Sequence, residues 1–173
     1  QFLAISTSES THGNALKIKD LKNNGAFKTM VSDFETENNL IDHIGDGLFL
    51  IQTNYNAPNG MLVLADFKTP EQNNWQTLIA EKEYVLSGVS LAGDKIVASY
   101  IKDVQSKIEV YDLKGKYLYD LKLPGIGIAN FAGDKDENTA FYSFSSFTYP
   151  TTIFKYDIKN NSSEIFFEPK TAF

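Results

Sequence analysis

The sequence predicts an all-β protein made of repeated antiparallel sheets, and three observations carry this prediction. One short pattern occurs four times at nearly constant spacing, and each copy is followed by residues typical of tight turns. No long helical pattern interrupts the series, and residues 70–75 are expected to form at most one helical turn. The 173 residues, 42% of them hydrophobic, are enough to build a core.

The repeated pattern is a six-residue β-rich segment with an aspartate next to its end. Its copies are LKIKDL, LVLADF, IEVYDL and IFKYDI, at residues 16–21, 62–67, 108–113 and 153–158. The aspartates lie at positions 20, 66, 112 and 157, so that successive ones are 46, 46 and 45 residues apart. A fixed period of about 20 to 50 residues is typical of propellers and solenoids.

Each copy predicts one strand of a four-stranded unit. An upstream β-rich run predicts the strand before it, at 2–6, 48–53, 96–101 and 140–144. A turn and an outer strand follow it, the strand at 27–31, 75–79, 117–121 and 164–167. A weaker innermost strand is expected at 40–44, 85–89 and 126–131, and the first repeat lacks one.

Four strands per repeat predict β-propeller blades, because helical solenoids need a 3.6-residue period and parallel β-helices have shorter coils. We therefore expect a β-propeller segment of about four four-stranded antiparallel blades, with approximate repeats 1–38, 39–83, 84–124 and 125–173. The chain begins with Gln1 rather than Met, directly before the predicted strand at 2–6, so it is expected to be a segment of a longer polypeptide.

The composition excludes several classes of function. A net charge of −6 repels nucleic acid and anionic lipid, and no apolar run approaches the length of a membrane span. With no cysteine and two histidines, disulfides and thiolate chemistry are excluded, and we predict no cofactor and no metal. The compartment of this soluble chain, cytoplasm or periplasm, stays open.

Three stretches resemble the prolyl oligopeptidases, a family of serine peptidases, and the resemblance is closest to bacterial members. The stretches are TNYNAPNGMLVLADFKTPEQNNWQTLI at 53–79, SYIKDVQSKIEVYDL at 99–113 and YSFSSFTYPTTIFKYD at 142–157. The resemblance implies a seven-bladed propeller that gates an α/β-hydrolase domain and admits short proline-containing peptides. The implied partners are that catalytic domain, in the same polypeptide, and the peptide substrate.

No catalytic residue is predicted in this chain, because it contains no G-x-S-x-G motif for a serine nucleophile. The resemblance implies a substrate-facing loop within residues 6–16, where mammalian-type members carry an arginine, a glutamate and a cysteine. This sequence matches only Glu9, with Ser8 and Thr11 in place of the other two. His12 is a further candidate for substrate contact.

Other interpretations stay open beside this one. The chain could be a propeller scaffold for protein–protein interaction, or an enzyme of the glycosidase type with paired carboxylates in the propeller channel. The repeated aspartates are expected to cap turns rather than bind calcium. Most aromatic side chains are expected to fill the core, and open blade edges predict that the segment self-associates.

Overall fold

The computed structural model describes residues 1–170, and it consists of β-strands with one short 3-10 helix, η1 (Gln72–Asn74). The strands form four antiparallel sheets, one of three strands and three of four. The chain divides into two compact units, Gln1–Glu83 and Tyr84–Phe173. Among the described residues no helix has the length and apolar character that crossing a membrane requires.

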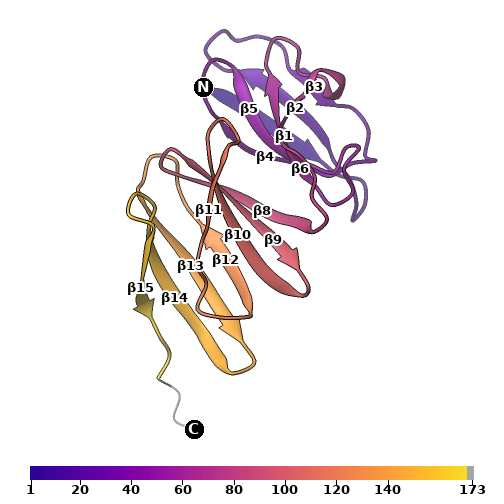
Figure 1. Ribbon diagram of the computed structural model, residues 1–173. Helices are drawn as coiled ribbons and strands as arrows, with labels where there is room; N and C mark the ends of the chain where they lie inside the picture. Colours follow the sequence, from indigo (N-terminus) through magenta and orange to yellow (C-terminus); the bar gives the residue numbers. More distant parts are fainter. Residues whose placement is uncertain (171–173) are drawn as a thin grey trace. The chain divides into compact units, whose positions relative to one another are not determined.

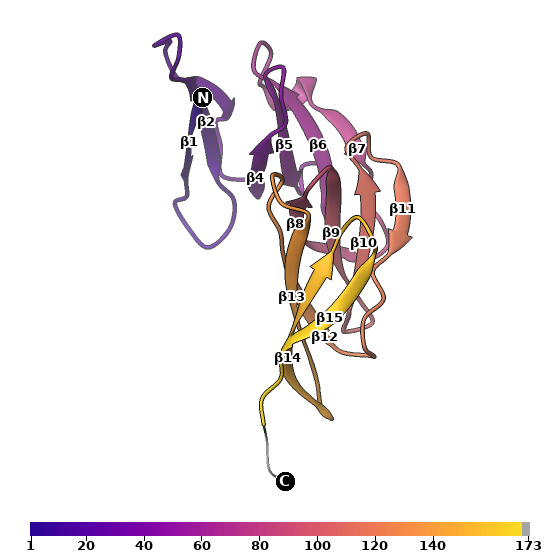
Figure 2. The same cartoon turned by 90° about the vertical axis from the view of Figure 1, so that its left-hand side faces the viewer.

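The first unit contains two sheets, and in each of them the strands follow one another in sequence order (Figure 1). The first sheet is β1 (Phe2–Thr7), β2 (Ala15–Asp20) and β3 (Lys28–Val31). The second is β4 (Asn38–His43), β5 (Leu48–Thr53), β6 (Met61–Asp66) and β7 (Gln76–Ile79). Strands β1 and β2 lie side by side as a hairpin (Figure 2).

The second unit repeats this arrangement with two four-stranded sheets. One is β8 (Val85–Ala92), β9 (Lys95–Lys102), β10 (Gln105–Asp112) and β11 (Tyr117–Asp120). The other is β12 (Ile128–Ala132), β13 (Thr139–Ser146), β14 (Tyr149–Asp157) and β15 (Ser162–Phe167). Each sheet is a meander whose neighbouring strands are antiparallel, as in a propeller blade.

These sheets confirm the predicted fold class, including the missing inner strand of the first repeat and the helical turn before Trp75. Several strands are longer than predicted, and the largest early starts are those of β10 at Gln105 and β14 at Tyr149. Strand β10 extends because the chain reverses tightly at Asp103 and Val104, whose φ angles are 49° and 60°. Such left-handed residues match the twist of a two-residue hairpin turn.

The outer strands share a feature that the repeat pattern does not reveal. Each of β3, β7, β11 and β15 pairs with its neighbour through a register shift, at Leu16/Lys17, Leu62/Val63, Val110/Tyr111 and Ile153/Phe154. A bulge beside a sheet edge bends the strand and makes the edge a poorer template for further pairing.

The core of the first unit lies between its two sheets. Leu16 and Ile18 of β2 pack with Phe49 and Ile51 of β5, and all four are at most 2% exposed. Alternate residues of a strand face the same side, so this spacing places one face of each sheet in the core. His43 belongs to the same region, with its ring 5.1 Å from that of Phe49.

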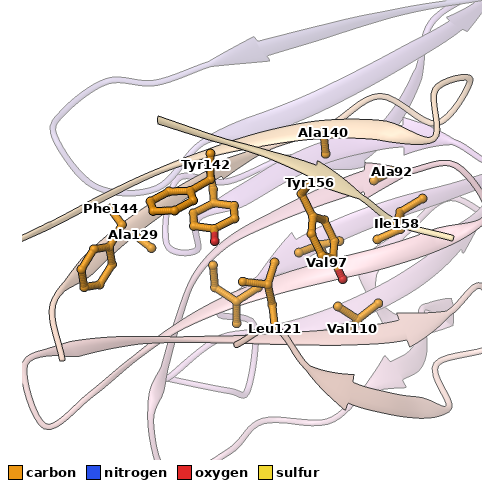
Figure 3. Packing of buried hydrophobic residues seen from close by; sticks show 12 residues of the cluster. Ala92, Val97, Val110, Leu121, Ala129, Ala140, Tyr142, Phe144, Tyr156 and Ile158 are labelled. Carbon is orange, nitrogen blue, oxygen red and sulfur yellow. The ribbon is translucent and has the colours of Figure 1, made fainter. Parts of the chain in front are cut away.

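The core of the second unit is richer in aromatic residues. Tyr142 and Tyr156 are buried and point toward Leu121 and Val110 (Figure 3). Tyr142 stacks on Phe154 with ring centroids 4.9 Å apart. The prediction that these aromatics fill a core is confirmed for Tyr142 and Phe144, whereas Phe147 in the β13–β14 turn is fully exposed.

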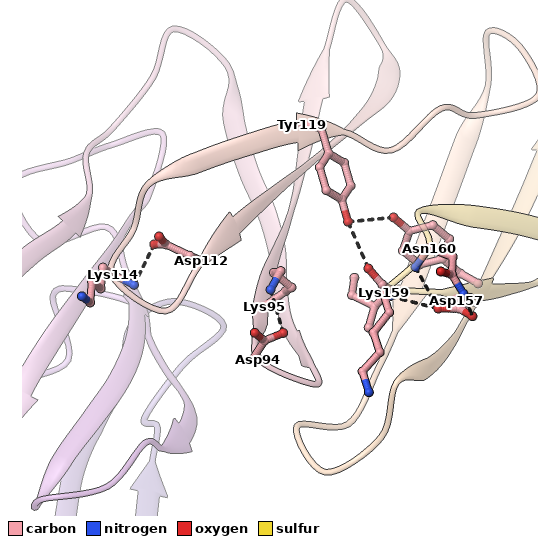
Figure 4. A network of polar contacts seen from close by, with 10 residues as sticks. Asp94, Lys95, Asp112, Lys114, Tyr119, Asp157, Lys159 and Asn160 are labelled. Carbon is pink, nitrogen blue, oxygen red and sulfur yellow. Dashed lines mark hydrogen bonds and ion pairs between the residues drawn. The ribbon is translucent and has the colours of Figure 1, made fainter.

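The repeated aspartates cap the turns after their strands, as predicted. Asp20, Asp66, Asp112 and Asp157 each accept a hydrogen bond, of 2.8 to 2.9 Å, from the backbone N–H two residues later. Figure 4 shows this arrangement at Asp112 and at Asp157, where Asn160 also donates through its side chain. Their period therefore reports the position of a hairpin in each blade.

Candidate functional site

The four predicted site residues lie in the loop that joins β1 to β2. Ser8, Glu9, Thr11 and His12 are all exposed. The Ser10 hydroxyl closes the loop tip, since it donates to the carbonyl of His12 and accepts from its N–H, both at 3.2 Å. The structure thus presents these side chains together on one short segment.

One ion pair joins this loop to the segment before β4. His12 Nδ1 lies 3.8 Å from Glu37 Oε1, and the two side chains are 86% and 66% exposed. An ion pair between such exposed groups contributes little to stability, and it requires a protonated histidine. Glu37 therefore holds His12 only weakly.

The base of the loop is held much more firmly. Asn14 and Asn38 interlock, since the Asn38 N–H donates to Asn14 Oδ1 at 2.6 Å and Asn14 Nδ2 donates to the Asn38 carbonyl at 2.9 Å. Asn38 is 5% exposed, and Thr53 Oγ1 donates to its Oδ1 at 2.7 Å. The loop is consequently anchored to β4 and β5 while its tip remains in solvent.

Gly13 completes this anchor, and no other residue type fits its position. Its φ is +71°, and a Cβ placed on it would lie 1.7 Å from the carbonyl oxygen of Phe34. Left-handed backbone is costly for L-residues other than glycine. The close approach of Gly13 to Phe34 therefore sets the direction in which residues 8–12 leave the sheet.

The loop offers hydroxyl, carboxylate and imidazole groups at once. These groups can donate to and accept from the backbone of a peptide, which suits binding. Among residues 1–170 no group of three or more His, Asp or Glu side chains gathers in a way that could hold a metal ion. The exposed groups of this loop are therefore suited to binding a ligand through hydrogen bonds.

A groove on the first unit is a second feature, and the sequence did not indicate it. A hollow of about 630 Å³ lies between β3 and residues 68–73, and another of about 400 Å³ lies beside β6 and β7. Both are lined by Tyr55, Gln72 and Asn73, so the two hollows are neighbours, and we refer to them together as the groove. None of the four predicted loop residues lines it.

The walls of this groove are fixed by specific contacts. The Trp75 indole N–H donates to the Pro70 carbonyl at 2.8 Å, and the Tyr55 hydroxyl donates to Asn73 Oδ1 at 3.1 Å. Lys28 Nζ donates to the Phe67 carbonyl at 2.8 Å. These contacts join residues up to 39 positions apart, which explains why a strand pattern does not predict the groove.

The second unit contains a buried carboxylate that the sequence analysis did not single out. Glu109 on β10 is 1% exposed. Its Oε1 accepts from Lys107 Nζ at 2.6 Å and from the Tyr84 hydroxyl at 3.1 Å, and its Oε2 accepts from the Tyr111 hydroxyl. Alternation along β10 puts residues 107, 109 and 111 on one face, which is the signal that could have identified the group.

These contacts shift the protonation of the neighbours of Glu109. Burial raises the pKa of Tyr111, and its hydrogen bond to Glu109 raises it further, so the hydroxyl stays protonated. Burial lowers the pKa of Lys107, but the hydrogen bond and charge of Glu109 outweigh it, so the pKa is raised overall. The cluster is thus held as a charged pair with a phenolic donor, which favours a structural role.

Comparison with known proteins shows which family this chain belongs to. Residues 1–169 match the family model described as the prolyl oligopeptidase N-terminal β-propeller domain. Prolyl endopeptidases of Elizabethkingia miricola and Elizabethkingia meningoseptica are 40% and 37% identical over all of this chain and 24% of their own lengths. The family resemblance predicted from the sequence is confirmed.

A solved structure agrees with these matches. It comes from a structural and mechanistic analysis of two prolyl endopeptidases that concerns inter-domain dynamics in catalysis and specificity. It superposes on 95% of this chain with a TM-score of 0.87 and 27% sequence identity. This chain covers 24% of that protein, so it spans about a quarter of the length of the proteins that it matches.

Proposed function

This chain belongs to the prolyl oligopeptidase family, as part of its N-terminal β-propeller domain, and we propose that it gates access of short proline-containing peptides to a catalytic centre. That centre belongs to an α/β-hydrolase domain elsewhere in the same polypeptide. The chain itself hydrolyses nothing. In this proposal repeats 1–38, 39–83, 84–124 and 125–173 are consecutive blades, and residues 171–173 of the last repeat lie outside the part of the chain that the structure describes.

The observation that carries this proposal is the match of the propeller model to nearly the whole chain, residues 1–169. The chain has no G-x-S-x-G motif, and catalysis by a serine triad requires a nucleophile on a strained turn beside an oxyanion hole. The side chains that the β1–β2 loop presents to solvent suit binding rather than bond cleavage. A role in substrate admission therefore agrees with both the family and the chemistry.

The loop of residues 8–12 contacts the peptide in this proposal. Its anchored base and exposed tip support the role, because a fixed base limits the entropy lost when a ligand binds. Glu9 attracts a peptide amino group, and His12 exchanges Glu37 for an acceptor on the peptide. Ser8 and Thr11 supply hydroxyl groups that hydrogen-bond to the peptide backbone.

A length series tests the gate on the full-length protein that carries this segment. A chromogenic Gly-Pro peptide, a longer proline-containing peptide and the same sequence within a folded protein are compared as substrates. We expect kcat/KM to fall with size and the folded protein to remain uncleaved. Equal cleavage of the folded protein would mean that the propeller does not select by size.

Loop variants of the same protein test the contact residues. Glu9→Gln with His12→Ala should raise KM about two- to tenfold with little change in kcat, because a hydrogen bond contributes a net of roughly 0.5 to 1.5 kcal/mol. Lys22→Ala in the exposed β2–β3 turn is the matched control. An unchanged KM in the loop variant would remove residues 8–12 from the substrate path.

The last sheet supports a further part of the proposal, self-association of the isolated chain. Phe141, Ile153, Phe166 and Phe167 are 36% to 64% exposed on the fourth sheet, and all six residues of β15 are exposed. An exposed apolar edge strand is a template for pairing with another chain. Sedimentation should show association that increases with concentration, and a monomer at every concentration would contradict it.

A further inference from the structure

The sequence contains two Asn-Gly pairs, Asn24-Gly25 and Asn59-Gly60, which the structure places in opposite environments. An asparagine side chain followed by glycine is open to attack by the next backbone nitrogen, because glycine has no Cβ to obstruct the approach. Whether this reaction occurs depends on the freedom of the two reacting groups. Both pairs lie in the first unit, so each serves as the control for the other.

Asn24-Gly25 lies in the turn that joins β2 to β3. Residues 21–27 are all exposed, and Asn24 has a left-handed φ of 44°. Among residues 1–170 the Asn24 side chain has no hydrogen-bond partner, and no side chain accepts from the Gly25 N–H. A Cβ built on Gly25 would meet no atom within 4 Å. The Asn24 side chain can therefore rotate toward the Gly25 nitrogen without breaking a side-chain hydrogen bond.

At Asn59-Gly60 both nitrogen atoms that the same reaction uses are held by hydrogen bonds. Asn59 Nδ2, the group that would leave, donates to the Lys82 carbonyl at 2.9 Å. The Asn59 N–H donates to Glu81 Oε1 at 2.6 Å. The nitrogen that would attack, in the buried Gly60, donates to the Ala57 carbonyl at 2.7 Å. Rotation here must first break these hydrogen bonds.

We propose that Asn24 is a site of spontaneous deamidation in the folded protein and that Asn59 is protected. The Gly25 nitrogen forms a bond to Asn24 Cγ, the Cγ–Nδ2 bond breaks, and ammonia leaves with the proton of the Gly25 N–H. Water then opens the resulting succinimide ring at either carbonyl. Opening at Cγ gives aspartate, and opening at the backbone carbon gives isoaspartate.

Aspartate or isoaspartate at residue 24 would lie in a turn that the Asp20 carboxylate already caps. Asp20 accepts from the Lys22 N–H at 2.9 Å and from the Asn23 side chain. A new negative charge at residue 24 repels Asp20, and isoaspartate adds one backbone atom to the turn that sets the β2–β3 register. Deamidation therefore weakens the pairing of β3, whose Met30 and Val31 are buried.

The test is incubation of the folded protein at mildly alkaline pH, followed by peptide mapping by mass spectrometry. Asn24 should convert at least about tenfold faster than Asn59, because hydrogen bonds at Asn59 must open first. In denaturant the two sites should convert at similar rates. Gly25→Ala should slow conversion at Asn24 and leave Asn59 unchanged, since the added methyl has open space in the fold.

Two results would overturn the proposal. One is conversion of Asn59 as fast as Asn24 in the folded protein. The other is an Asn24 that stays intact when folded but converts in denaturant, which would show that the turn is rigid. A lower unfolding temperature for the deamidated form, separated by ion exchange, would support the effect on β3.

Discussion

Glu109 joins side chains from two parts of the second unit through one buried carboxylate. Replacing it by glutamine keeps the shape and removes the charge, so Lys107 loses its closest ion-pair partner and one phenolic donor faces an amide N–H. Glu109→Gln should lower the free energy of unfolding by about 2 to 3 kcal/mol. Urea unfolding followed by circular dichroism measures it.

Glu164→Gln is the matched control for this change. Glu164 Oε1 also pairs with a lysine, Lys155, at 3.1 Å, but its side chain is 69% exposed. Exposed pairs contribute at most about 1 kcal/mol, so the control should barely change stability. Equal effects of the two substitutions would show that burial of Glu109 has no energetic consequence.

Asp157 makes the free energy of unfolding depend on pH. Hydrogen bonds from the Asn160 N–H and side chain and from the Lys159 N–H hold the pKa of its carboxyl below the usual value of 3.8. A lowered folded pKa contributes stability that is complete above the unfolded value and disappears as the pH falls through the folded value.

Asp157→Asn should therefore cost stability at neutral pH and flatten the loss of stability on acidification below 3.8. Unfolding curves across this acid range measure the slope. Asp136→Asn, in another exposed turn, is the comparison. A slope identical to that of the unmodified protein would show that the turn bonds do not favour the charged form.

Among the elements, the β9–β10 hairpin carries the clearest local strain. Val104 is β-branched and has a φ of 60°, a left-handed backbone conformation that is unfavourable for such a residue. Its side chain is 88% exposed, so it contributes little packing energy to offset this cost. Val104→Gly should raise the free energy of unfolding by about 1 kcal/mol. Val104→Ala keeps the backbone cost and should give no comparable gain.

The strands show what a sequence can and cannot predict at this scale. Asp66 and its counterparts could be assigned to turns because the aspartate, the turn residues and the strand are adjacent in the chain. The early start of β10 was missed because it depends on left-handed backbone at Val104, which its residue type disfavours. The bulges were missed because they are features of paired strands.

For the whole molecule, the repeated pattern predicted the four-stranded sheets, and the three family-like stretches predicted membership of the prolyl oligopeptidase family. The candidate loop could be located at residues 8–12, but its anchor could not, because Gly13 meets Phe34 and Asn14 meets Asn38 only after folding. The groove at Tyr55 and the burial of Glu109 also depend on contacts between distant residues. Local patterns do not encode such contacts.

We propose that this chain is a gate without chemistry of its own, and the peptidase activity of the isolated chain is the sharpest test of that proposal. The chain is first shown to be folded by its β-sheet circular dichroism and a cooperative thermal transition. It is then incubated with a chromogenic Gly-Pro peptide. We expect release of the chromogen no faster than in the protein-free blank, whereas turnover comparable to that of a complete prolyl peptidase would show that the chain has catalytic chemistry of its own.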